Sequence, residues 1–259
     1  MTEDRFPSTT ARTRRHFIWG ETLRGKTIGR TLLNWGLQER AAQIRAAGGA
    51  GPWLDLAGGQ SPSYHRILGL PSSTIRPVMV DIHSPGCPGV VADLNRPLPF
   101  KEASATVVIF LNALHIFPDP RSVLRDTVRV LEPGGLLILA APFVFPENPE
   151  PHDCWRFTGE GLRLIFDDIG FSGVEVTGIG ERWTTVASLL TPFLRPKLVR
   201  AVAYLLADWL DRLTSRRFGL QPCPMTYLAL ARKPAPHTTR AVPPRQAAAV
   251  GLNEDGVPK

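Results

Sequence analysis

The sequence feature that most constrains the fold is a pair of apolar runs separated by one helical segment. ATVVIFL (105–111) and LLILAAPF (136–143) lack the polar alternation of strands that face water. Such runs are typical of strands buried on both faces of a parallel sheet. Between them, 118–135 has Asp119 as a candidate N-cap, Pro120 at the first helical position and a Pro-Gly-Gly stop. Two buried strands joined by a helix predict an α/β sheet with helices on both faces.

The rest of the chain continues this alternation of strands and helices. We expect further strands at 52–56, 77–82, 89–94, 172–180 and 224–233, and helices at 22–47 and 158–171. The predicted fold is therefore a Rossmann-like, mostly parallel seven-stranded sheet, with helices on both faces and a helical cap inserted before the last strand.

The predicted domain covers residues 21–233, with N-terminal helices at 22–47 and the helical cap at 181–220. Residues 1–20 are polar and rich in Arg and Thr, so we expect a loose basic segment. The composition of 234–259 predicts a disordered tail.

Within the cap, residues 197–213 form an amphipathic pattern. Its apolar face consists of Leu198, Val202, Leu205, Leu206, Trp209 and Leu213. Three interpretations stay open: packing on the chain's own domain, packing in a homodimer, and peripheral contact with a membrane surface.

The net charge of +7 is unevenly distributed along the chain. Basic residues dominate 1–30 and 195–245, and the segments between them are acidic in sum. A nucleic-acid substrate is disfavoured, because phosphate contacts need basic residues around the site. Three cysteines without paired spacing argue against a disulfide framework and against a metal site. With no signal peptide or membrane span in the sequence, we expect a cytoplasmic protein, or one peripheral at the inner membrane face.

The stretch WLDLAGGQSPSY (53–64) places an acid and two glycines at the end of the first predicted strand. Ligands of doubly wound sheets bind over the carboxyl ends of the strands. Asp81 ends the second strand, where an acid accepts the hydroxyls of a ribose, and Asp93 ends the third. A nicotinamide-dependent oxidoreductase would need G-x-G-x-x-G opening a helix, and Ser61-Pro62-Ser63 stands there instead.

Several motifs together resemble those of a known family. They are LDLAGGQSP (54–62), VDIHS (80–84), ADLNRPLPF (92–100), RVLEPGGLLIL (129–139) and PHDCWRFTGEGL (151–162). In this order they resemble the class I S-adenosylmethionine-dependent methyltransferases of the methyltransferase type 11 group. The resemblance covers about residues 50–175 and the final strand. Ala57 and Ser61 replace the family's first and third motif glycines, and Leu114-His115-Ile116 stands where many relatives have Leu-Glu-His.

The resemblance implies a role for each matching residue around S-adenosylmethionine. Asp81 and Ile82 would lie at the ribose, Asp93 and Leu94 at the adenine, and Asn112 on the methionine side. The methionine end would be held by Asp55 and the turn of Ala57, Gly58 and Gly59.

The resemblance also implies methyl transfer to a small-molecule or lipid-linked sugar acceptor, at an oxygen in preference to a nitrogen or carbon. PHDCWRFT resembles a subgroup associated with cell-surface polysaccharide and lipid-linked sugar pathways. The sulfonium leaving group needs no acid, so a hydroxyl acceptor needs only positioning and a base. His152, oriented by Asp153, and His115 are the candidate bases. Alternatively, 151–158 is a structural loop in which Asp153 pairs with Arg156. The altered glycine turn keeps a second function open, a catalytically inactive binding or scaffold protein.

Overall fold

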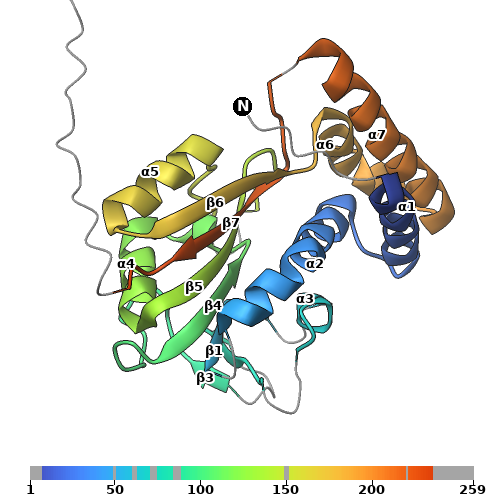
Figure 1. Ribbon diagram of the computed structural model, residues 1–259. Coiled ribbons are helices and arrows are strands. Elements are labelled where there is room, and N and C mark those ends of the chain that lie inside the picture. The colour runs from blue at the N-terminus through green and yellow to red at the C-terminus, as the bar shows by residue number, and fades with distance from the viewer. Residues whose placement is uncertain are drawn as a thin grey trace, which may run out of the picture.

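The computed structural model describes residues 8–48, 51–59, 63–70, 75–83, 89–148, 152–219 and 221–235, with positions 8–12 and 215–217 described by their backbone alone. A seven-stranded sheet forms its centre (Figure 1). The strands are β1 (Trp53–Leu56), β2 (Val78–Asp81), β3 (Gly89–Val91), β4 (Ala105–Leu111), β5 (Leu131–Pro142), β6 (Ser172–Ile179) and β7 (Thr226–Arg232).

The strand order is β3-β2-β1-β4-β5-β7-β6. All pairings from β3 to β5 are parallel, whereas β7 runs antiparallel to both β5 and β6. The predicted mostly parallel, seven-stranded sheet is therefore confirmed. The order reverses between β1 and β4, and such a switch point leaves a crevice beyond the carboxyl ends of the strands.

Alternate residues of the central strand β4 face opposite sides of the sheet. Val108 and Phe110 belong to the core under α4 (Pro120–Val130) and α5 (Gly159–Ile169). Val107 and Ile109 belong to a second core, which α2 (Ile28–Gly48) and α3 (Ser63–Ile67) cover. Figure 1 shows these helix pairs on the two faces of the sheet. The continuous apolar run is explained by this double burial.

Helix α4 begins as predicted and ends earlier than predicted. Asp119 caps it by accepting a hydrogen bond from the backbone N–H of Ser122 at 3.1 Å. We expected the helix within 118–135 to continue until Pro133-Gly134-Gly135 stops it, but it ends at Val130, and Leu131 pairs with Ala105 as the first residue of β5. This long-range pairing overrides the helical pattern of the last turn.

The N-terminal segment differs from our expectation of a loose 1–20. Residues from Ser8 onward form the helix α1 (Ser8–Leu23). Ile18 is fully buried on it, and the Arg14 guanidinium lies 3.0 Å from the carboxylate of Asp208. Because α1 is ordered by a helix almost 200 positions away, its own pattern did not reveal it.

The helices α6 (Arg182–Leu189) and α7 (Lys197–Phe218), with the short 3-10 helix η2 (Thr191–Phe193) between them, lie between β6 and β7. This is where we expected a helical cap. Helices α6, α7 and α1 lie together beside the sheet, near the beginning of α2 (Figure 1). We call residues 181–219 the helical insertion. The expected tail lies outside the described residues from position 236 onward.

None of the helices in the described part of the chain has the length and hydropathy of a membrane-crossing span. Among the same residues, no three His, Cys, Asp or Glu side chains come together as a candidate metal site.

Candidate active site

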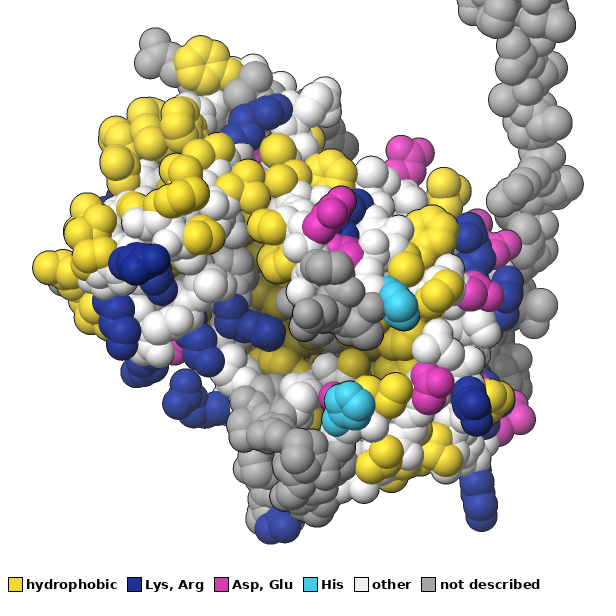
Figure 2. Space-filling view, turned by 180° about the vertical axis from the view of Figure 1, so that it is seen from behind, with side chains coloured by type: hydrophobic (Ala, Val, Ile, Leu, Met, Phe, Trp, Pro, Cys, Tyr) yellow, Lys and Arg dark blue, Asp and Glu magenta, His cyan; other side chains and the backbone are white. Residues whose placement is uncertain are grey.

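A cavity of about 890 Å³ opens over the carboxyl ends of β1, β2 and β4, at the predicted switch point. In Figure 2 this side of the molecule is hollowed, with hydrophobic side chains on the floor and histidine side chains at the rim. The lining residues are Ala57, Asp81, Ile82, His83, Ala92, Asp93, Leu94, Asn95, Asn112, Ala113, His115, Ile116, Phe117, Pro118, Asn148 and His152. The structure thus brings together most of the predicted site residues.

Asp81 lies at the end of β2 and connects two loops at the cavity wall. One carboxylate oxygen accepts a hydrogen bond from the backbone N–H of Gly59 at 3.3 Å, and the other from that of His83 at 3.2 Å. Gly59 has a φ of +68° and Ala57 a φ of +54°, so the chain turns sharply after β1. The Cβ of Ala57 is sterically strained in this left-handed conformation, and a glycine at this position would not be.

Asp55 lies beneath this turn, outside the cavity lining. Its side chain is fully buried, and both carboxylate oxygens accept hydrogen bonds from the Tyr64 hydroxyl at 2.9 Å. His65 Nε2 lies 2.5 Å from the same carboxylate. A Cβ on Gly58 would lie 2.6 Å from Asp55 Oδ1, so only glycine fits above the carboxylate. Asp55 therefore supports the turn from below, whereas we expected it to contact a ligand.

Burial shifts the pKa of both partners in this cluster in the same direction. Desolvation raises the pKa of Asp55 above its ordinary value, although the hydrogen bonds from His65 and Tyr64 oppose the shift. Burial, together with the Asp55 charge, also raises the pKa of the Tyr64 hydroxyl. Tyr64 therefore stays protonated and donates a hydrogen bond to the carboxylate.

Asp93 follows β3 on the neighbouring part of the wall. Its Oδ1 accepts hydrogen bonds from the backbone N–H and the side-chain amide of Asn95, each at 2.9 Å. These bonds lower the pKa of Asp93, so the carboxylate is charged at neutral pH. The adjacent Leu94 is buried, whereas Ile82 is 56% exposed at the rim.

Asn112 reverses the chain after β4. Its φ is +55°, a conformation that Asn tolerates better than most residues. Its backbone N–H still bonds to the carbonyl of Ala140 at 2.8 Å, and its side-chain oxygen accepts from the Thr226 hydroxyl at 3.4 Å. Residues 113–118 then form a short 3-10 helix and a turn along the cavity wall.

His115 lies in this segment and is only 6% exposed. Its Nδ1 has no hydrogen-bond partner among the described residues. Burial lowers the pKa of His115, and the nearby charge of Asp153 opposes the shift. The imidazole is therefore neutral at pH 7.

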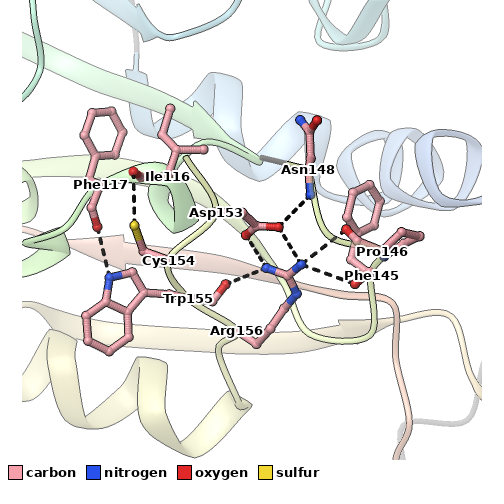
Figure 3. Close-up of polar contacts among 9 residues, drawn as sticks. All are labelled: Ile116, Phe117, Phe145, Pro146, Asn148, Asp153, Cys154, Trp155 and Arg156. Atoms are coloured by element: carbon pink, nitrogen blue, oxygen red, sulfur yellow. Dashed lines mark hydrogen bonds and ion pairs between the residues drawn. The ribbon is translucent and has the colours of Figure 1, made fainter. Parts of the chain in front are cut away.

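The segment 152–156 is a loop that is hydrogen-bonded to the neighbouring residues Ile116 and Phe117 (Figure 3). Asp153 binds both terminal nitrogens of Arg156 and accepts the backbone N–H of Asn148 at 2.8 Å. The Trp155 indole donates to the carbonyl of Phe117 at 2.9 Å. Arg156 lowers the pKa of Asp153 below its ordinary range.

This arrangement follows the structural-loop interpretation of the sequence. Asp153 is paired with Arg156, so it does not orient His152 as we had considered. His152 lines the cavity with an exposed side chain. Of the two candidate bases, His115 is the buried one.

Sequence reasoning missed several lining residues. His83 and Asn95 each follow a predicted ligand residue by one or two positions. Their place directly after predicted strand ends could therefore have identified them. Asn148 comes from a proline-rich loop with no motif of its own, and only the fold brings it to the cavity.

Comparisons with known proteins identify a family and relatives that this chain resembles. Residues 74–139, which include β2 to β4 and most of β5, match the family described as "Methyltransferase domain". A curated relative, the O-methyltransferase rstn1 of Aspergillus nomiae, is 30% identical over 94 residues, which are 32% of this chain and 42% of that protein. The chain thus matches less than half the length of this relative.

Two solved structures share the fold at low sequence identity. A SAM-dependent methyltransferase from Archaeoglobus fulgidus aligns with a TM-score of 0.51 and 17% identity, over 79% of this chain and 94% of the other. The [4+2]-cyclase SpnF aligns with a TM-score of 0.51 and 15% identity, over 77% of this chain and 81% of the other. Because a protein named a cyclase has the same fold, the fold alone does not fix the reaction.

Proposed function

We propose that this chain, which belongs to the class I S-adenosylmethionine-dependent methyltransferases, is an O-methyltransferase. It transfers a methyl group from S-adenosylmethionine to a hydroxyl oxygen of a small or amphiphilic acceptor. One observation carries the proposal. Asp81, Asp93 and Asn112, from the ends of three strands, border a single cavity of about 890 Å³.

The residues of the cavity fit the parts of the cofactor. Asp81, a carboxylate on the wall, is suited to accept the two ribose hydroxyls, and Asp93 with the apolar Leu94 is suited to the adenine. The turn at Ala57 and the amide of Asn112 would hold the methionine side. When bound, the cofactor supplies the methyl group on a sulfonium that leaves without an acid.

The chain's own residues must then position the acceptor and take its proton. His115 is the better-placed base, because its imidazole is neutral and lines the cavity. The loop at 152–156 fixes the backbone around it, since the N–H groups of Cys154 and Trp155 both donate to the His115 carbonyl. The wall nearby is apolar, with Ile116, Phe117 and Pro118, and this favours an acceptor with an apolar part.

Binding and transfer can be tested separately. Calorimetric titration with S-adenosylhomocysteine should give micromolar binding to the full chain. Transfer of radiolabel from S-adenosylmethionine should then be measured against paired panels of alcohols and amines that share their apolar parts. The absence of binding at millimolar ligand would overturn the proposed cofactor site. Binding without product for any acceptor would favour a binding protein over an enzyme.

The base is tested by comparing two alanine variants. We expect His115→Ala to reduce turnover about 100-fold or more, in the range of general base catalysis, while cofactor binding is retained. His152→Ala, at the exposed rim, should stay within about threefold of the wild type. If both variants turn over like the wild type, neither histidine is the base.

A further inference from the structure

The helical insertion exposes its apolar face to solvent. Helix α7 has the amphipathic pattern expected from its sequence, but it packs on the domain through the opposite face. Its buried residues are Ala201, Tyr204, Ala207, Asp208 and Asp211. Its exposed apolar residues along this face are Leu198 (59%), Val199 (51%), Val202 (55%), Leu206 (52%), Trp209 (46%) and Leu213 (47%), and Phe218 (61%) is exposed at the C-terminal end of the helix.

The exposed apolar surface continues onto the elements beside α7. Phe193 in η2 is 80% exposed, the highest value among the large hydrophobic residues that the structure describes. Trp183, Val186, Leu189 and Leu190 in and after α6 are each more than 40% exposed. In Figure 2 yellow side chains gather over this part of the molecule. We call these residues together with the exposed apolar residues of α7 the insertion face. Contiguous apolar surface of this kind marks a site of interaction.

Polar contacts hold α7 in this orientation, so the exposure is built into the fold. The buried Asp211 accepts hydrogen bonds from the backbone N–H groups of Trp183 (2.7 Å) and Thr184 (3.0 Å) and from the Thr184 hydroxyl (2.6 Å). Asp208 binds Arg14 at 3.0 Å and Arg212 at 2.8 Å. Rotating α7 to bury its leucines would break all these contacts and expose two paired carboxylates.

The exposed charges of the helical insertion are basic. Of its three acidic residues, Asp208 and Asp211 are buried, and Glu181 is partly buried with its carboxylate bonded to the backbone at the beginning of α6. The same segment contains seven Arg and Lys residues. Of these, Arg195 and Lys197 are exposed at the beginning of α7. In Figure 2, dark blue side chains lie beside the yellow ones.

An apolar helix face with cations and without exposed carboxylates matches an anionic lipid surface. A second copy of the chain fits less well. A twofold interface would bring two copies of this same face together, so Arg195 and Lys197 would meet a surface whose own residues offer no exposed carboxylate to pair with them. Half-exposed tryptophans such as Trp183 and Trp209 suit the boundary between headgroups and acyl chains.

We propose that the insertion face docks on the surface of an anionic phospholipid bilayer, with α6 and α7 lying in the plane of the interface. This docking does not depend on methyl transfer, and it adds a membrane location to a chain whose described helices cannot span one.

The test is sedimentation of the full chain with vesicles. Vesicles of phosphatidylcholine alone are compared with vesicles that also contain about one-third phosphatidylserine, the anionic lipid of such surfaces. We expect binding to the anionic vesicles that weakens as salt is raised, and little binding to the neutral ones. Protein that remains in the supernatant with anionic vesicles would overturn the proposal.

Two leucine variants test whether vesicle binding depends on the insertion face or on any exposed leucine. Leu206→Ser, at 52% exposure on α7, should weaken vesicle binding about fivefold. Leu164→Ser makes the same change at 57% exposure on α5 and should leave binding unchanged. Equal effects of the two substitutions would refute the assignment to the insertion face.

A charge variant and the oligomeric state complete the test. Lys197→Glu should weaken binding to anionic vesicles by about fivefold or more, because each cation near such a surface contributes about 1 kcal/mol. Sedimentation equilibrium should show a monomer. A dimer that Leu206→Ser converts to monomer would assign the face to a second copy and overturn the proposal.

Discussion

Replacing Gly58 by alanine tests whether the buried carboxylate beneath the turn sets the shape of the candidate site. The added Cβ would lie 2.6 Å from Asp55 Oδ1 and 2.7 Å from Asp55 Cγ. Both distances are far inside van der Waals contact, so either the turn or the carboxylate must move. Asp55 cannot move freely, because it is fully buried and bound by Tyr64 and His65.

The expected cost has two contributions. Overpacking by one methyl group in a filled site costs about 1–3 kcal/mol, and loss of a hydrogen bond to a charged group costs about 1.5–3 kcal/mol. We expect Gly58→Ala to lower the free energy of unfolding by about 3 kcal/mol. For a domain of this size the midpoint of thermal unfolding should fall by about 6–12 °C.

Gly59→Ala is the matched control, one position along the same turn. Its Cβ would meet nothing within 4 Å, so only the φ of +68° opposes it. The left-handed conformation costs about 1–2 kcal/mol, and this variant should therefore be the milder of the two. Equal losses for Gly58→Ala and Gly59→Ala would mean that backbone strain, and not the clash with Asp55, decides the outcome.

A double-mutant cycle with Tyr64→Phe identifies the mechanism. Tyr64→Phe removes the hydroxyl that donates to both oxygens of Asp55. If Gly58→Ala already displaces Asp55, the two losses overlap. The double variant should then lose about 1 kcal/mol less free energy of unfolding than the sum of the two single losses. Losses that add within about 0.5 kcal/mol would refute the reasoning.

Four further predictions concern single side chains. Asp81→Asn should weaken binding of S-adenosylhomocysteine about 10- to 100-fold in calorimetry, the value of a charge-assisted hydrogen bond, whereas the surface variant Asp168→Asn should not. The lowered pKa of Asp153 adds stability above pH 3.8 that is lost below it, so Asp153→Asn should flatten the acid limb of a stability–pH profile. The lowered pKa of His115 means that the unfolded chain binds its proton more strongly, so stability should fall as pH drops below about 6.5, and His115→Gln should remove this fall. Asp211→Ala should cost about 2 kcal/mol and speed hydrogen exchange of the Thr184 amide, because it removes the carboxylate that caps α6.

The sheet could be predicted because its signals are local. Unbroken apolar runs such as 105–111 identify strands buried on both faces, and Asp119 with Pro120 marks where a helix begins. The end of α4 could not be predicted in the same way, since the pairing of Leu131 with Ala105 joins positions far apart in the sequence. Helix α1 was missed for the same reason, because its stability comes from α7 near the other end of the described chain.

The candidate site was predictable where it consists of strand ends. Asp81, Asp93 and Asn112 all line the cavity, because residues that end neighbouring parallel strands meet at one edge of the sheet. Asp55 lies one residue before the end of β1, but side chains alternate between faces along a strand and the direction of this one cannot be read from the sequence. Its partners Tyr64 and His65, in α3, draw it beneath the turn.

Helix α7 shows a different limit of sequence reasoning. Periodicity determines which residues share a face, and Leu198, Val202 and Leu206 do share one. It does not determine which face is buried, since that depends on the surface the helix meets. Here the polar face is the better fit, because small residues allow close approach and Asp208 and Asp211 meet the Arg14 guanidinium and the N–H groups at the beginning of α6. Buried carboxylates are costly unless they are paired, and these two are paired only in this orientation. Among the described residues, the apolar face is therefore left exposed by the contacts that stabilise the polar one, and this exposure is the basis on which we propose a membrane surface as its partner.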